Sequence, residues 1–85
     1  MHIHTVKEIR KEYYIKFGEN LQKLLIKHQK DVMTVASIGK IEPKQVYRVL
    51  NGDHGASLGT IISIAKGLDI QPKELFDFEF NLEKE

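Results

Sequence analysis

The sequence of 85 residues predicts an all-α fold in a single domain, and three observations support this prediction. Residues 6–28 place apolar side chains at spacings of three and four, as on one face of a helix. Asp31 and Ser57 each precede a short apolar run, as helix N-caps do. Pro43 and Pro72 stand where further helical segments would begin, and the first helical turn tolerates proline because its missing N–H has no partner there.

The first predicted helix covers residues 6–28, and its apolar residues form one stripe. The stripe consists of Val6, Ile9, Tyr13, Phe17, Leu21, Leu24 and His28. Gly18 is a candidate position for a bend in this helix, because glycine weakens a helix interior.

The segment from Asp31 to Gly52 predicts two short helices joined by a tight turn. The apolar face of the first short helix consists of Val32, Val35, Ala36 and Gly39. The small residues on this face would let another helix approach closely. Ile41 falls in the turn, Pro43 begins the next helix, and the run "NGDHG" ends it.

A fourth helix is predicted after Ser57, with a buried face of Leu58, Ile61, Ile62, Ala65 and Leu68. Pro72 then opens one short turn through Phe76. In residues 77–85, Phe78, Phe80 and Leu82 recur at every second position, which is typical of a short strand or of a tail that docks on another surface. We also expect this alternating tail to contribute to a twofold dimer contact.

The net charge of +1 conceals a polarised chain. Residues 1–30 carry seven Lys or Arg against three Glu, whereas residues 56–85 carry three Lys against six acidic residues. One basic face could therefore meet a polyanion. The absence of cysteine excludes a disulfide framework and thiolate metal ligands, and no apolar run is long enough to span a bilayer, so we expect a cytoplasmic protein without membrane contact.

From about residue 17 to residue 76, the chain resembles the lambda-repressor-like helix-turn-helix domains of the Cro/XRE family. The resemblance lies in "FGENLQKLL", "VASIGKIEPKQVYRVLNG" and "SLGTIISIAKGLDIQPKELF". It implies a five-helix domain over residues 17–76, with an N-terminal helical extension over residues 1–16 and a short acidic and aromatic C-terminal tail over residues 77–85. It further implies a transcriptional regulator that binds double-stranded DNA as a homodimer and that occupies an operator.

The predicted recognition helix begins at Pro43. At about 100° per residue, Val46, Val49 and Leu50 form its buried stripe. The outward side chains offer hydrogen bonds to base edges and phosphates in a major groove. The predicted DNA-binding residues are Lys44, Gln45, Tyr47, Arg48 and Asn51. The N-terminal amides of the preceding helix would lie near a phosphate.

The sequence departs from the family pattern in three ways. Val32 replaces a frequent glutamine, and "DHG" replaces a frequent basic loop, so two customary DNA contacts are missing. Leu25 and Leu50 occupy positions where the family often pairs Arg with Glu, and their joint change preserves an apolar contact.

Several other polar residues indicate roles other than DNA binding. Lys7, Arg10, Lys11 and Lys16 fit a solvated helix face better than a DNA arm. His2 and His4 do not predict a metal site, and we expect no metal or cofactor. Asp53 and His54 are more typical of a turn than of a catalytic pair, so we expect no enzyme activity. The alternative function is a protein-interaction module, such as an antitoxin-like subunit that engages a protein partner through its C-terminal tail.

Overall fold

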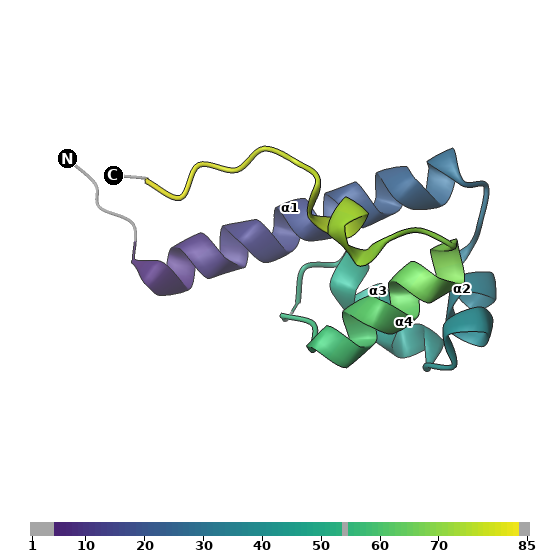
Figure 1. Cartoon of the computed structure of the whole chain (residues 1–85). Helices are drawn as coiled ribbons and strands as arrows, with labels where there is room; N and C mark the ends of the chain where they lie inside the picture. The colour runs from purple at the N-terminus through teal and green to yellow at the C-terminus, as the bar shows by residue number, and fades with distance from the viewer. Residues whose placement is uncertain (1–4, 54, 84–85) are drawn as a thin grey trace.

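The computed structural model describes residues 5–53 and 55–83, so His2, His4 and His54 lie outside the described residues. The chain order is α1 (Val6–Lys27), α2 (Val32–Gly39), α3 (Pro43–Leu50), α4 (Leu58–Leu68) and the 3-10 helix η1 (Pro72–Phe76) (Figure 1). No strand occurs among the described residues, and the predicted all-α class is confirmed.

The predicted count of five α-helices is not confirmed, because the last segment is a 3-10 helix. The amide of Glu74 donates to the carbonyl of Gln71 at 3.0 Å, and the amide of Asp77 donates to the carbonyl of Glu74 at 3.2 Å. These bonds span three residues, which is the 3-10 pattern and is common in short segments. Pro72 leaves only five residues before the chain departs as the tail, too few for a regular α-helix.

Helix α1 is continuous from Val6 to Lys27, and the boundary expected at residues 16 and 17 falls inside it. Thr5 caps its start, since the hydroxyl accepts from the amide of Glu8 at 3.1 Å. Gly18 does not interrupt the helix, and its role is close packing instead. A Cβ at this position would lie 2.5 Å from the carbonyl oxygen of Leu50, so only glycine lets the end of α3 lie directly against α1.

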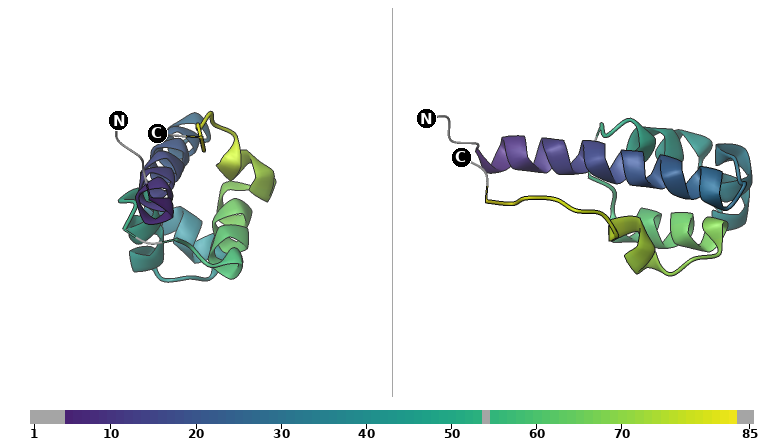
Figure 2. Two further views of the ribbon diagram at one scale, coloured as in Figure 1. Left: turned by 90° about the vertical axis from the view of Figure 1, so that its left-hand side faces the viewer. Right: turned by 90° about the horizontal axis from the view of Figure 1, so that it is seen from above.

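The other helices lie against the C-terminal half of α1, and its N-terminal half extends beyond them (Figures 1 and 2). Helices α2 and α4 pack closely, because a Cβ at Gly39 or Gly67 would collide with backbone of the facing helix. This confirms the close approach predicted at Gly39. Asn20 of α1 donates its amide to the carbonyls of Glu74 at 3.0 Å and Leu75 at 2.9 Å, which fixes η1 against α1.

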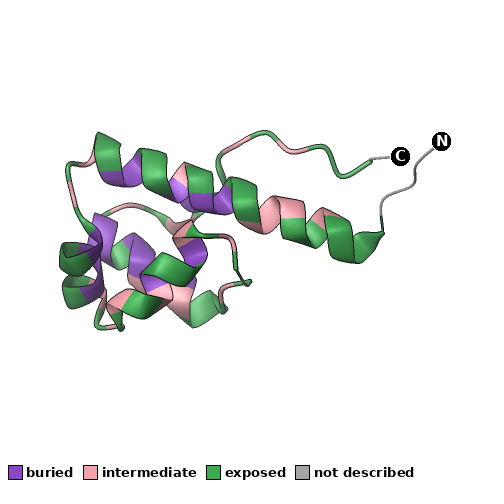
Figure 3. Ribbon diagram, turned by 180° about the vertical axis from the view of Figure 1, so that it is seen from behind, coloured by how far each residue is buried: buried purple, intermediate pink, exposed green. Residues whose placement is uncertain are grey.

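The buried residues form one core between α1 and the four shorter elements (Figure 3). Its fully buried large side chains are Leu21, Ile64, Leu68, Leu75, Val35 and Val46. The predicted face of α4 was partly wrong: Leu58 is 70% exposed and Ile62 is 52% exposed, whereas Ile64 is buried. The buried face of α4 includes Ile61 and, three residues later, Ile64. The side of the helix that carries Ile62 therefore points away from the core.

The C-terminal tail runs beside the N-terminal half of α1 and docks there through aromatic rings (Figure 2). The ring of Tyr13 lies 5.0 Å from Phe78 and 4.9 Å from Phe80, and the ring of Phe17 lies 5.0 Å from Phe76, between centroids. Such separations are typical of favourable aromatic pairs. Of the two forms predicted for this segment, the structure has the docked tail, and its described rings pack within the same chain.

Candidate nucleic-acid interface

The turn between α2 and α3 is fixed by local backbone geometry. Lys40 ends α2 in the left-handed conformation, with φ of 58°, and Ile41 then packs against the core. At the start of α3, the amide of Glu42 donates to the side-chain oxygen of Gln45 at 3.3 Å. Pro43 follows at the first helical position, where its ring imposes a helical φ. These features set the direction in which α3 leaves the turn.

Helix α3 has one buried face and one solvent face. Val46 is fully buried and Val49 is 5% exposed, as their spacing predicted. The opposite face exposes Lys44, Tyr47, Arg48 and Asn51. Four of the five predicted DNA-binding residues therefore share a solvent-exposed surface. Gln45 differs, because it is half-buried and its oxygen is engaged at the helix start, which leaves its amide nitrogen for another partner.

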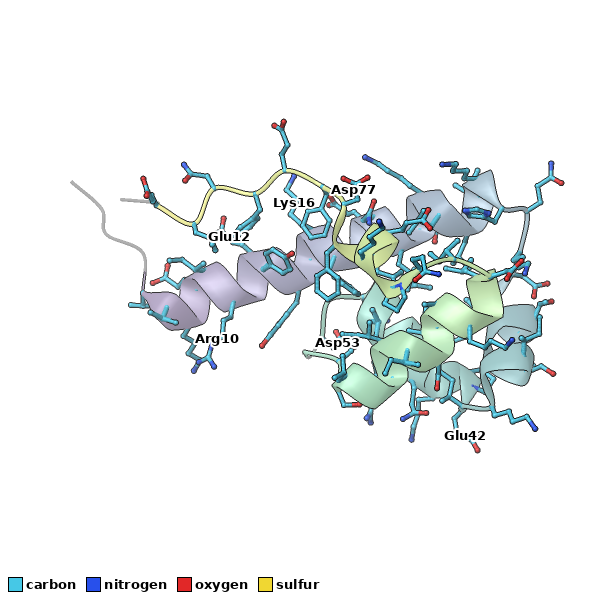
Figure 4. The ribbon with its side chains drawn as sticks, viewed as in Figure 1. Arg10, Glu12, Lys16, Glu42, Asp53 and Asp77 are labelled. Carbon is cyan, nitrogen blue, oxygen red and sulfur yellow. The ribbon has the colours of Figure 1, made fainter. Side chains whose placement is uncertain are left out.

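The cations of this face are available for a ligand. Neither Lys44 nor Arg48 forms an ion pair with any residue in the described part of the chain. Glu42 precedes the helix and Asp53 follows it, and both are exposed (Figure 4). The positive charge is thus concentrated on the helix itself, with one carboxylate beyond each end.

The N-terminus of α2 differs from a phosphate-binding helix end. Val32 is buried, and the Asp31 carboxylate accepts from the amide of Thr34 at 2.8 Å. This hydrogen bond stabilises the charged form and lowers the pKa of Asp31 below its ordinary value of 3.8. The Thr34 amide, one of the N-terminal amides predicted to lie near a DNA phosphate, therefore already donates its hydrogen bond to the Asp31 carboxylate. The negative charge of this carboxylate would also repel a phosphate.

Two sets of polar side chains near α3 were not predicted as contacts. One set consists of Ser57 and Thr60 at the start of α4, which line a groove together with Arg48 of α3. The other set lines a groove beside the end of α3, where Asn51 lies with Lys7, Arg10 and Lys11 of α1. The spacing of the α1 cations indicated that they share a helix face, but no sequence signal placed that face next to Asn51.

No helix in the described part of the chain is both long enough and apolar enough to cross a membrane.

Residues 20–81 match the family model described as the Cro/C1-type HTH DNA-binding domain, which is more than half of the chain. Among solved structures, the chain is similar to the restriction-modification controller protein C.AhdI from Aeromonas hydrophila, with 32% sequence identity and a TM-score of 0.71. That alignment covers 76% of this chain and 98% of the controller protein. A search of curated proteins returned no match. The fold and the family match are those of a DNA-binding regulator and not of an enzyme. This chain belongs to the Cro/C1-type helix-turn-helix DNA-binding domain family.

Proposed function

We propose that this protein is a sequence-specific transcriptional regulator that acts by occupying an operator, with α3 in the major groove. The observation that carries the proposal is the outer face of α3, whose cations and amide lie opposite the buried Val46 and Val49. A helix of this kind fits the major groove of B-DNA, which is about 12 Å wide. The DNA-reading unit in this proposal is residues 17–76.

The side chains of α3 have distinct roles in this proposal. Arg48 donates two parallel hydrogen bonds to guanine O6 and N7, and Asn51 recognises an adenine edge, since these are the pairings that guanidinium and amide geometry favour. Lys44 contacts a guanine or a phosphate. Tyr47 and the amide nitrogen of Gln45 contact the flanking sugar-phosphate backbone.

The proposed active form is a homodimer on a pseudo-palindromic site, with two α3 helices about 34 Å apart. The proposal is supported by Leu58 and Ile62, which lie one turn apart on α4 and remain 70% and 52% exposed. Burial of these two side chains between two protomers would remove their apolar surface from water, which favours association. Sedimentation of the parent protein with and without its duplex tests this assembly, and a monomer bound to a single half-site would contradict it.

The test of DNA reading begins with selection of bound fragments from random DNA. Fluorescence anisotropy then compares the selected duplex with a scrambled duplex for the parent, Lys44→Ala and Arg48→Ala. A lost base contact costs roughly 1–3 kcal/mol, which corresponds to about 5- to 150-fold in affinity for the selected duplex. Binding to the scrambled duplex should change much less, because it carries no specific base contact.

Lys73→Ala is the matched control, because Lys73 is an exposed lysine on η1, which packs mainly on α1 and α4. The control should bind like the parent at equal salt. If the parent binds both duplexes equally at every salt concentration, or if Arg48→Ala and Lys44→Ala behave like Lys73→Ala, α3 is not a recognition helix.

A further inference from the structure

The N-terminal half of α1 carries a cluster of three cations that the family match does not cover. The match begins at residue 20, whereas Lys7, Arg10 and Lys11 lie earlier on α1. Their spacings of three and four place them on one side of the helix. All three are exposed, and we call this surface the α1 basic ridge.

The basic ridge lies on the side of α1 that meets the end of α3. Lys7, Lys11 and Gly18 are separated by four and seven residues, so they form one stripe along the helix. Gly18 is the point where the Leu50 carbonyl lies against α1. One residue beyond Asn51, a Cβ at Gly52 would lie only 2.9 Å from the Cα of Ile15. The face of α1 that contacts the end of α3 at Gly18 therefore also carries Lys11 and Lys7, nearer the N-terminus.

The ridge and the end of α3 enclose a common groove of about 490 Å³, lined among others by Lys7, Arg10, Lys11 and Asn51. Asp53 is the acidic residue in its lining. Arg10 points toward the side of α1 where Asp53 lies, whereas Lys16 points toward the tail (Figure 4). Lys16 also lies within 3.9 Å of the Glu19 carboxylate. The three ridge cations form no ion pair with the described residues. Because the groove lining carries three cations and one carboxylate, the groove is net positive.

Two features of this cluster are unfavourable for the stability of α1. Like charges three and four residues apart repel on a helix surface. Lys7 also lies in the first turn of α1, where the helix dipole disfavours a cation. A polyanionic partner would remove both penalties.

We propose that the α1 basic ridge binds the phosphate backbone beside the major groove that α3 occupies. This inference rests on the proposed function. Measured along the helix axis from Ile15, Lys11 and Lys7 lie roughly 6 and 12 Å away at 1.5 Å per residue. The major groove is about 12 Å wide. With the end of α3 in the groove, side chains along a ridge of this length would reach the DNA backbone at the groove edge. The contact is electrostatic and independent of the base sequence. It supplies backbone contacts that are missing at Val32 and at the "DHG" run after α3.

The test compares two triple variants of the full chain. The first replaces Lys7, Arg10 and Lys11 with Ala, and the matched control replaces Lys16, Lys23 and Lys27, which share the opposite face of α1 and are all exposed. Both lose the same charge from the same helix, and alanine favours helix formation, so both should fold. Anisotropy titrations at several salt concentrations give the slope of log affinity against log salt for the selected and scrambled duplexes.

The ridge variant should lose about 2–3 units of slope, since each phosphate contact contributes about 0.9. The preference for the selected over the scrambled duplex should stay unchanged, and the control variant should keep the parent slope. Equal slopes for the two triple variants would overturn the inference while leaving α3 as the reader of DNA. Failure of the parent to distinguish the duplexes at any salt would instead overturn the proposed function.

Circular dichroism first establishes that the triple variants are helical. If the ridge variant is not folded, the double variant Lys7→Gln with Lys11→Gln replaces it, with an expected slope loss of about 2 units. A double variant with the parent slope would overturn the inference equally well.

Discussion

Phe78→Ala tests whether the C-terminal tail is an integral part of this fold. The Phe78 ring is half-buried, with its centroid 5.0 Å from that of Tyr13 and 6.3 Å from that of Phe17. Truncation of a fully buried phenylalanine typically costs 3–5 kcal/mol, and an aromatic pair contributes about 0.5–1.5 kcal/mol of such a loss. Because Phe78 is only half-buried, we expect the free energy of unfolding to fall by about 2 kcal/mol.

The assay is thermal unfolding followed by far-ultraviolet circular dichroism, together with urea unfolding at fixed temperature. In a domain of this size, each kcal/mol shifts Tm by about 4–8 °C, so the expected decrease is roughly 8–16 °C. The control is Leu82→Ala in the same tail. Leu82 is 66% exposed, and its truncation should change stability by no more than about 0.5 kcal/mol.

Two results would refute this account of the tail. Equal stability of Phe78→Ala and Leu82→Ala would show that the Phe78 ring contributes no packing. A loss that depends on protein concentration would show that the ring packs across a dimer interface, because only intermolecular contacts respond to concentration. The second result would support the twofold dimer contact that the alternating sequence predicted.

Two further predictions concern the packing of α1 and the cap of α2. Gly18→Ala should lower the free energy of unfolding by about 1–3 kcal/mol, because its Cβ would collide with the Leu50 carbonyl and outweigh a helix-propensity gain of about 1 kcal/mol. Gly59→Ala is the control, since its Cβ would meet nothing nearer than 3.9 Å, and thermal melts in which both variants are stabilised would contradict the close approach. The stability contributed by the Asp31 carboxylate is present above its ordinary pKa of 3.8 and is lost as the pH falls through its lower folded-state pKa. Urea titrations between pH 5 and 2 should therefore show a weaker pH dependence for Asp31→Asn than for the parent, and identical curves would contradict the assignment.

The features that the sequence determined by itself are local ones. Asp31 and Ser57 were predicted as N-caps, and their side chains accept from the amides three residues later, at 2.8 and 3.1 Å. The two faces of α3 followed from helix periodicity, with Val46 buried and Arg48 exposed. These features depend on residues within one or two turns, so the order of side chains along the chain specifies them.

The tertiary structure decided the features that join distant segments. Gly18 is a contact point rather than a bend because the end of α3 lies against it, more than thirty residues later in the chain. The Phe78 ring docks on Tyr13, and Arg10 shares a groove with Asn51, for the same reason. Periodicity assigns a residue to a face of its own helix, but which neighbour covers that face depends on how all the helices pack together. Only the packed chain could therefore place the basic ridge of α1 beside the helix proposed to read DNA.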